Sequence, residues 1–204
     1  MDLSPPQCDA LLDIARRAIR ETLAGRAWVP EPPVDPTVSQ PAGCFVSLHS
    51  MESHQLRGCV GRLDADHSLY ETVCEMAAGV LRDPRFSAHP VQLSELDSLE
   101  LEISVLSRPR LARDPLDFEL LSDGIYLMAA GETGCFLPQV ARETGWNRHM
   151  LLDRLCTEKM GLAARAWKDP SARLFIFSTL VIGPAAFNPE TAQPSEPKSS
   201  ARLP

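Results

Sequence analysis

Leu56-Arg57-Gly58-Cys59-Val60-Gly61 places a thiol, a guanidinium group and two glycines within six residues, where an ordinary strand would carry β-branched side chains. Because glycine weakens a strand, two of them beside a cysteine indicate a bulge or a close approach by another molecule. Arg57 adds a planar cation suited to a carboxylate or a phosphate. The alternative is a glycine-kinked strand with a buried, inert Cys59 and a surface Arg57. We expect residues 56–61 to line a concave surface, with Arg57 partly exposed.

The segments on either side of a polar turn at 50–53 predict a hairpin. Residues 44–49 and 55–60 read as its two strands, without an Asn-Gly pair to fix their register. If His49 pairs with His54, Cys44 lies directly opposite Cys59, near the separation that a disulfide needs. A slip of one residue would send the two thiols to opposite faces. Disulfide formation between Cys44 and Cys59 is therefore an open question at this point.

The remaining elements alternate between helices and strands. Two helices with capping boxes are predicted to begin after Ser4 and Ser68, and the first should turn Arg16 outward. The other expected elements are a strand at 99–105, a hairpin of 125–129 with 135–137, helices that begin at Pro138 and after Asn147, and a central strand at 174–182. This order predicts an α+β fold with a mixed, largely antiparallel sheet and packed helices, in a larger and a smaller subdomain. We expect one domain over 1–188 and a disordered tail over 189–204.

The composition excludes several classes of protein. The chain has 204 residues and a net charge of −7, the wrong sign for a general nucleic-acid binder. No apolar run is long enough to cross a bilayer, and no secretory signal is visible at the N-terminus. The six cysteines contain no C-x-x-C pair, which favours reduced thiols in the cytoplasm. We therefore expect a cytoplasmic protein without a metal or cofactor of its own, and the oligomeric state stays open.

Several motifs together resemble the AMMECR domain family. LRGCVG at 56–61 is similar to its LRGC(I/V)G signature, and further matches fall in family-like order over about residues 7–187: LDIARRAI at 12–19, FVSL at 45–48, DPRF at 83–86, LEISVLS at 101–107, FLPQV at 136–140, GW at 145–146 and ARLFIF at 172–177. The family includes protein A of the AmmeMemoRadiSam system of bacteria and archaea. The resemblance implies an α+β protein with two subdomains whose partners are a Memo-like protein and a radical-SAM protein. Metal and radical chemistry would then belong to those partners.

The candidate site residues gather around the same motif. Cys59 is the candidate catalytic nucleophile, and the alternatives are a packing residue without chemistry or a contact to a ligand. Arg85 of the DPRF motif could form an anion clamp with Arg57, or it could simply pair with Asp83. The full set of candidate binding residues is Leu56, Arg57, Gly58, Val60, Gly61, Arg85 and Gln139.

Three roles stay open on the sequence. The first is a substrate-presenting, scaffold or coupled-reaction subunit of an AmmeMemoRadiSam-type system. The second is a stand-alone enzyme that uses Cys59 as its nucleophile. The third is a small-ligand or nucleic-acid binding module, of which nucleic acid is the least favoured because the chain is acidic. His49, His54 and His67 near the motif also raise the question of a metal site.

Overall fold

The computed structural model describes residues 2–189 and has an α+β fold. A single sheet has the strand order β2-β1-β3-β7-β5-β6, with β4 beside β7, and every neighbouring pair of strands is antiparallel. The strands are β1 (Cys44–Ser50), β2 (Leu56–Arg62), β3 (Leu99–Leu106), β4 (Arg110–Leu111), β5 (Asp123–Ala129), β6 (Glu132–Phe136) and β7 (Arg173–Ala186). The predicted fold class is confirmed, including the central position of the last strand.

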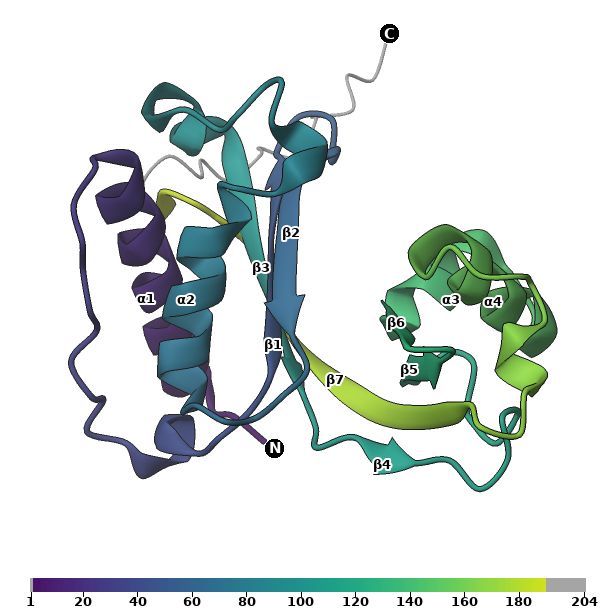
Figure 1. The fold of residues 1–204 in the computed structure, drawn as a ribbon. Coiled ribbons are helices and arrows are strands. Elements are labelled where there is room, and N and C mark those ends of the chain that lie inside the picture. Colours follow the sequence, from purple (N-terminus) through teal and green to yellow (C-terminus); the bar gives the residue numbers. More distant parts are fainter. Residues whose placement is uncertain (1, 190–204) are drawn as a thin grey trace, which may run out of the picture.

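Within residues 2–189 the sheet is accompanied by the α-helices α1 (Pro5–Leu23), α2 (Leu69–Val80), α3 (Pro138–Thr144) and α4 (Arg148–Arg154). A π-helical stretch, Leu155–Lys159, continues α4, and short 3-10 turns occupy Pro36–Ser39, Pro84–Phe86, Leu93–Ser98 and Ala166–Lys168. Figure 1 shows α1 and α2 beside strands β1–β3, and α3 and α4 beside β5 and β6, with β7 running between the two groups. None of the helices within residues 2–189 is long and apolar enough to span a bilayer.

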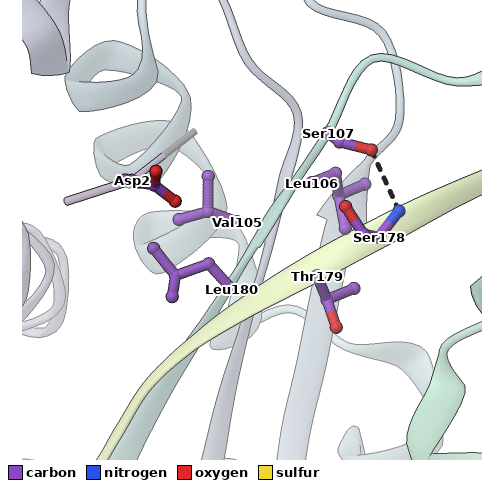
Figure 2. A pocket seen from close by; sticks show the side chains of 7 residues that line it. All are labelled: Asp2, Val105, Leu106, Ser107, Ser178, Thr179 and Leu180. Atoms are coloured by element: carbon purple, nitrogen blue, oxygen red, sulfur yellow. Dashed lines mark hydrogen bonds between the residues drawn. The ribbon is translucent and has the colours of Figure 1, made fainter. Parts of the chain in front are cut away.

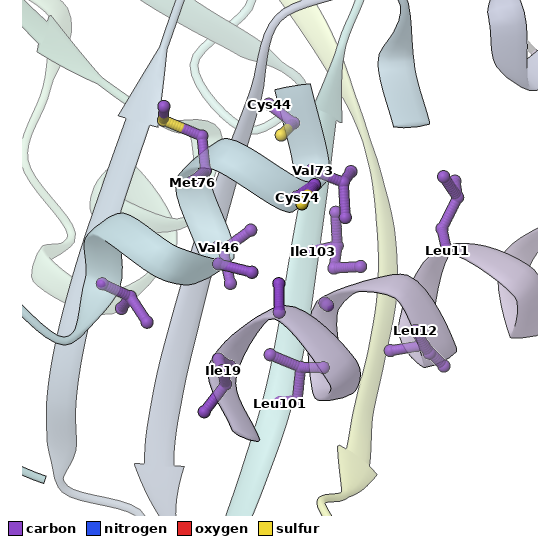
Figure 3. Close-up of a cluster of buried hydrophobic side chains, with 14 of the residues drawn as sticks. Leu11, Leu12, Ile19, Cys44, Val46, Val73, Cys74, Met76, Leu101 and Ile103 are labelled. Carbon is purple, nitrogen blue, oxygen red and sulfur yellow. The ribbon is translucent and has the colours of Figure 1, made fainter. Parts of the chain in front are cut away.

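The buried apolar side chains form two separate clusters. The first cluster joins α1 and α2 to β1–β3 and includes Leu11, Ile19, Val46, Val73 and Ile103 (Figure 3). The second cluster joins α3 and α4 to β5, β6 and the beginning of β7. Strand β7 contributes to both, because Leu174 and Ile176 lie in the second cluster and Ile182 lies in the first. One long strand therefore connects two hydrophobic cores.

The helix starts follow the sequence signals, whereas the predicted position of one side chain on α1 is wrong. In both predicted capping boxes the acceptor is present, since the backbone N–H of Ser4 donates to Gln7 at 2.7 Å and that of Ser68 donates to Glu71 at 3.2 Å. The expected outward position of Arg16 is wrong, because this side chain is buried. Its Nη2 donates to the carbonyl of Ala186 at 2.9 Å. The long stem allows arginine to lie along an apolar surface while its head reaches a polar group.

The register of the first hairpin excludes the alignment of Cys44 with Cys59. Ser47 lies opposite Cys59, and Cys44 lies opposite Arg62. The turn is longer than a His49–His54 pairing requires, since β1 continues to Ser50 and β2 begins only at Leu56. The three-residue shift in partner places the two thiols on opposite faces of the sheet. This register rules out a Cys44–Cys59 disulfide in this fold, and both cysteines are free thiols.

The two glycines of the motif permit close packing on opposite faces of β2. The ladder is irregular where Leu48 pairs with Gly58 and His49 pairs with Leu56, which leaves Arg57 as the extra residue of a bulge. A Cβ atom at Gly58 would lie 2.8 Å from the carbonyl oxygen of Val80, at the end of α2. A Cβ atom at Gly61 would overlap the ring of Phe45. The glycines therefore serve the approach of a helix end and of an aromatic ring.

The expected tail at 189–204 falls, apart from Pro189, outside the described residues.

Candidate functional site

Cys59 belongs to a row of polar side chains that crosses three neighbouring strands. Ser47 of β1 lies opposite Cys59 of β2 on one side and opposite Glu102 of β3 on the other. Directly opposed residues of antiparallel strands project from the same face of a sheet. Cys44, Val46 and Leu48 point into the first cluster, so the row projects from the other side, which we name the open face.

Residues from the second half of the chain approach this open face. Gln139, in the first turn of α3, reaches Ser104 of β3, with 3.5 Å between its Nε2 and the serine Oγ. The charge of Glu143, one turn further along α3, acts on Glu102. The positive charge of Lys159 acts on the thiols of Cys59 and of Cys135 on β6, and it lowers the pKa of both. The row therefore lies where the two halves of the molecule meet.

The surroundings of Cys59 disfavour its thiolate form. Burial raises its pKa above the usual value, because a desolvated thiolate is costly. The positive charges of Arg85 and Lys159 oppose this effect, whereas Asp83 and Glu102 add to it. Burial likewise raises the pKa of Cys135 to about 12. Burial therefore works against the thiolate form that a cysteine nucleophile needs.

The backbone of Cys59 is held by the side chains of the DPRF motif. Its N–H donates to Asp83 Oδ2 at 2.9 Å, and its carbonyl accepts from Arg85 Nη2 at 3.1 Å. Asp83 and Arg85 also bind each other, with 2.6 Å between Arg85 Nη2 and Asp83 Oδ2. Arg85 is the main reason that the pKa of Asp83 falls to about 2. Because β2 is an edge strand, these two side chains occupy the position that a further strand would take.

Arg57 also has a carboxylate partner. Its guanidinium donates to Glu95 Oε1 from Nε at 3.1 Å and from Nη2 at 2.8 Å, and to the carbonyl of His89 at 3.3 Å. The side chain is partly exposed, at 22%. Arg57 and Arg85 are therefore held by separate carboxylates, Glu95 and Asp83, rather than joined in one anion clamp.

The six residues of the motif do not share one surface. Val60 packs against the first cluster and Gly58 faces α2, whereas Cys59 projects from the open face. Leu56 is half-buried opposite His49. Gly61 lies beneath the ring of Phe45. The structure thus brings Cys59 together with Gln139 and Glu102, and places Arg57 at the bulge near the other end of β2.

No group of three or more His, Cys, Asp and Glu side chains within residues 2–189 is arranged to hold a metal ion. His54 lies 3.2 Å from Glu100, measured between Nδ1 and Oε1, in an exposed position.

Two hollows lie near the junction of the two halves. A smaller one of about 200 Å³ is lined by Asp2, by the end of β3 and by the part of β7 that pairs with it. Here the Ser178 N–H donates to Ser107 Oγ at 2.9 Å (Figure 2). A larger one of about 1110 Å³ extends from Gly43 and Asp64 to Tyr126 and Phe175. Neither hollow includes the row of Cys59, Ser47 and Glu102.

Sequence reasoning missed four neighbours of Cys59: Ser47, Glu102, Cys135 and Lys159. The alternation in β3 did place Glu102 on the face opposite the apolar residues. It could not show that this face meets α3, because that depends on the curl of the sheet. The serine of FVSL was the available signal, since a polar residue within an apolar strand is unusual.

The fold and the site together define a class of protein: an α+β molecule with two cores, one curled antiparallel sheet and a polar row where the cores meet. A sequence model of the AMMECR1 family matches residues 12–182, and the chain belongs to that family.

Curated archaeal relatives match along most of their length. Protein Ta0236 of Thermoplasma acidophilum is 30% identical over 89% of this chain and 92% of its own length. Protein TK0174 of Thermococcus kodakarensis is 35% identical over 82% and 85%, respectively. The crystal structure of the uncharacterized protein PH0010 from Pyrococcus horikoshii superposes with a TM-score of 0.77 at 32% identity, covering 84% of this chain and 88% of that one.

Proposed function

We propose that this AMMECR1-family chain is a ligand-presenting subunit of an AmmeMemoRadiSam-type system, which acts with a Memo-like and a radical-SAM protein in the cytoplasm. The binding site in this proposal is the open face around Cys59. The observation that supports it most is the row of Cys59, Ser47 and Glu102, which lies where residues of both cores approach. The two cores would then be the two subdomains expected for the family, and movement between them would open or close the site.

The chemistry of the row favours binding over catalysis by this chain alone. Burial raises the pKa of Cys59, so the thiol is a weak nucleophile at neutral pH. No histidine forms a hydrogen bond with its sulfur within residues 2–189, although a nucleophilic cysteine normally has an adjacent base. A stand-alone cysteine enzyme is therefore the less supported alternative. An acidic chain whose Arg57 and Arg85 already hold carboxylates also offers little to a nucleic acid.

Co-purification tests the proposal. A tagged full-length chain is expressed with the Memo-like and radical-SAM proteins of the same organism, and we expect it to retain both. The exposed Lys159 beside the site is the position to perturb, and Lys168 near Trp167 provides the matched control. Lys159→Glu should weaken retention, whereas Lys168→Glu should not. Failure of the unmodified chain to retain either protein would contradict the proposal.

A further inference from the structure

The larger of the two hollows has an apolar floor on the strands of the second core. Tyr126 and Met128 of β5 and Phe175 of β7 alternate with residues of the second cluster, so their side chains project from the opposite face of these strands. Tyr126 lies directly opposite Phe175, and the centroids of their rings are 6.1 Å apart. Met128, two residues further along β5, is 42% exposed. All three side chains line the hollow, so two aromatic rings and a thioether lie together on its floor.

The other walls of the hollow belong to one end of the strands of the first core. They are formed where the chain enters β1 and where it leaves β2 and β3, at residues 40–43, 63–66 and 106–109. About 1110 Å³ lies between these segments and the aromatic floor. Small-molecule sites are clefts of about 300–1,000 Å³, lined mainly by apolar and aromatic side chains with a few polar groups. The hollow is therefore large enough, and apolar enough on its floor, to receive a small organic ligand.

The charged residues of the lining favour neither a cation nor an anion. Asp64 already holds Arg62 through both carboxylate oxygens, at 3.0 Å and 2.7 Å. Asp66 and Arg108 carry opposite charges, and both residues are exposed. A charged ligand would be attracted by one of them and repelled by the other. Binding in the hollow then depends on the apolar floor rather than on the charge of the ligand.

We propose that the larger hollow binds an uncharged ligand through an aromatic ring that packs on Tyr126 and Phe175. Aromatic pairs stabilise a contact beyond the area that they bury, and the sulfur of Met128 provides a further favourable contact to a ring. The remaining volume accommodates the rest of the ligand beside residues 40–43 and 63–66. The row of Cys59, Ser47 and Glu102 does not line this hollow. The site is therefore separate from the one in the proposed function and does not depend on it.

Matched bicyclic probes test the ligand class directly. Near neutral pH, 2-naphthol, 2-naphthoate and 2-naphthylmethylamine share one ring system and are uncharged, anionic and cationic, respectively. Decahydro-2-naphthol keeps the carbon skeleton of 2-naphthol without its aromatic character. The dissociation constants of the four probes for the full chain are compared by calorimetry. We expect 2-naphthol to bind most tightly, and its saturated counterpart to bind about twofold to tenfold more weakly, which is the range for an aromatic pair.

Two methionines provide a matched pair of variants for the same measurement. Met128→Ala should weaken 2-naphthol binding about twofold to tenfold, which is the range for a contact between sulfur and an aromatic ring. Met150→Ala is the control, because Met150 is 44% exposed and lies on α4 outside the lining of the hollow. Its binding of 2-naphthol should not change. Tyr126→Ala should weaken binding at least as much as Met128→Ala, and thermal unfolding shows whether each variant is folded.

Three results would each overturn the proposed site: no binding of 2-naphthol, equal or tighter binding of a charged or saturated probe, or the same affinity in the Met128→Ala and Met150→Ala variants. Retention of the Memo-like and radical-SAM proteins does not depend on these probes. A negative probe result together with intact retention would therefore overturn the aromatic site alone.

Discussion

Cys59 is held at the edge of the sheet by side chains instead of by another strand. Asp83 accepts from its N–H, and Arg85 donates to its carbonyl. The pairing of Asp83 with Arg85 was one of the two interpretations of the DPRF motif, and it is the one observed. Its connection to Cys59 could not be predicted from sequence, because the two segments are 24 residues apart.

Asp83→Asn should lower the free energy of unfolding by about 1–3 kcal/mol at neutral pH, because Arg85 loses a charged partner. The unmodified chain should also lose stability as the pH falls from about 4 toward 2. The folded pKa of Asp83, about 2, lies below the usual 3.8, so this carboxylate stabilises the fold above pH 4 and ceases to do so when protonated.

Urea unfolding at several pH values measures both effects. Asp64→Asn is the control, since Asp64 pairs with Arg62 and is 51% exposed, and exposed pairs contribute about 0–1 kcal/mol. Equal losses in the two variants would contradict the structural role of Asp83.

Glu102→Gln should raise the melting temperature at neutral pH. The pKa of Glu102 in the folded state lies above its usual value. Its ionised form therefore destabilises the fold once the pH rises above the usual pKa of a glutamate. A neutral glutamine removes this cost, and we expect a gain on the order of 1 kcal/mol, or about 2–4 °C for a chain of this length. The gain should vanish at low pH, where Glu102 itself is neutral. A lower melting temperature at pH 7 would show that Glu102 has a stabilising partner.

At the scale of elements, strand β2 and helix α2 meet closely because of glycine. Gly58 allows the end of α2 to approach the strand, and Gly79 on α2 faces Val60 with ordinary spacing. The sequence predicted the bulge near the motif but not the reason for it. The close approach by another molecule was the alternative to a bulge, and at Gly58 the end of α2 occupies the position beside the backbone.

Gly58→Ala should destabilise the chain by about 1–3 kcal/mol, because the new methyl group would lie 2.8 Å from the Val80 carbonyl oxygen. Gly79→Ala is the matched control on the facing element. Its methyl group would lie 3.5 Å from Val60 Cγ1, and alanine favours a helix by up to about 1 kcal/mol. Thermal unfolding distinguishes the two variants. A stable Gly58→Ala protein would mean that α2 shifts at little cost.

Most elements could be predicted because their signals are local. The capping boxes and the alternation of β3 depend on neighbours within a few residues. The predicted hairpin register was wrong because no turn signature fixed the loop length. The predicted outward position of Arg16 was wrong because an arginine can reach a distant carbonyl. The polar row could not be predicted for a third reason, since its surroundings form only when α3 meets β3.

At the scale of the whole molecule, one curled sheet carries two cores (Figure 1). Its edge strands β2 and β6 each contribute a cysteine, and the charges of the two thiols act on each other. Cys59 and Cys135 belong to elements 70 or more residues apart along the chain, so local patterns could not relate them. The order of elements predicted the α+β fold class, and the family resemblance implied the same class. The proposed function requires that the partners meet the open face around Cys59.

The rate of Cys59 alkylation by iodoacetamide, measured by mass spectrometry with and without the Memo-like and radical-SAM proteins, tests this most directly. Cys59 should react slowly near neutral pH and faster as the pH rises, because burial raises its pKa. The partners should slow its alkylation several-fold. Cys8 on α1 is the internal control, because it is also partly buried but packs against the first cluster, away from the open face. The alkylation rate of Cys8 should not change. An unchanged rate at Cys59 with the partners bound, or slowing at Cys8 instead, would contradict the assignment of the open face as the functional site.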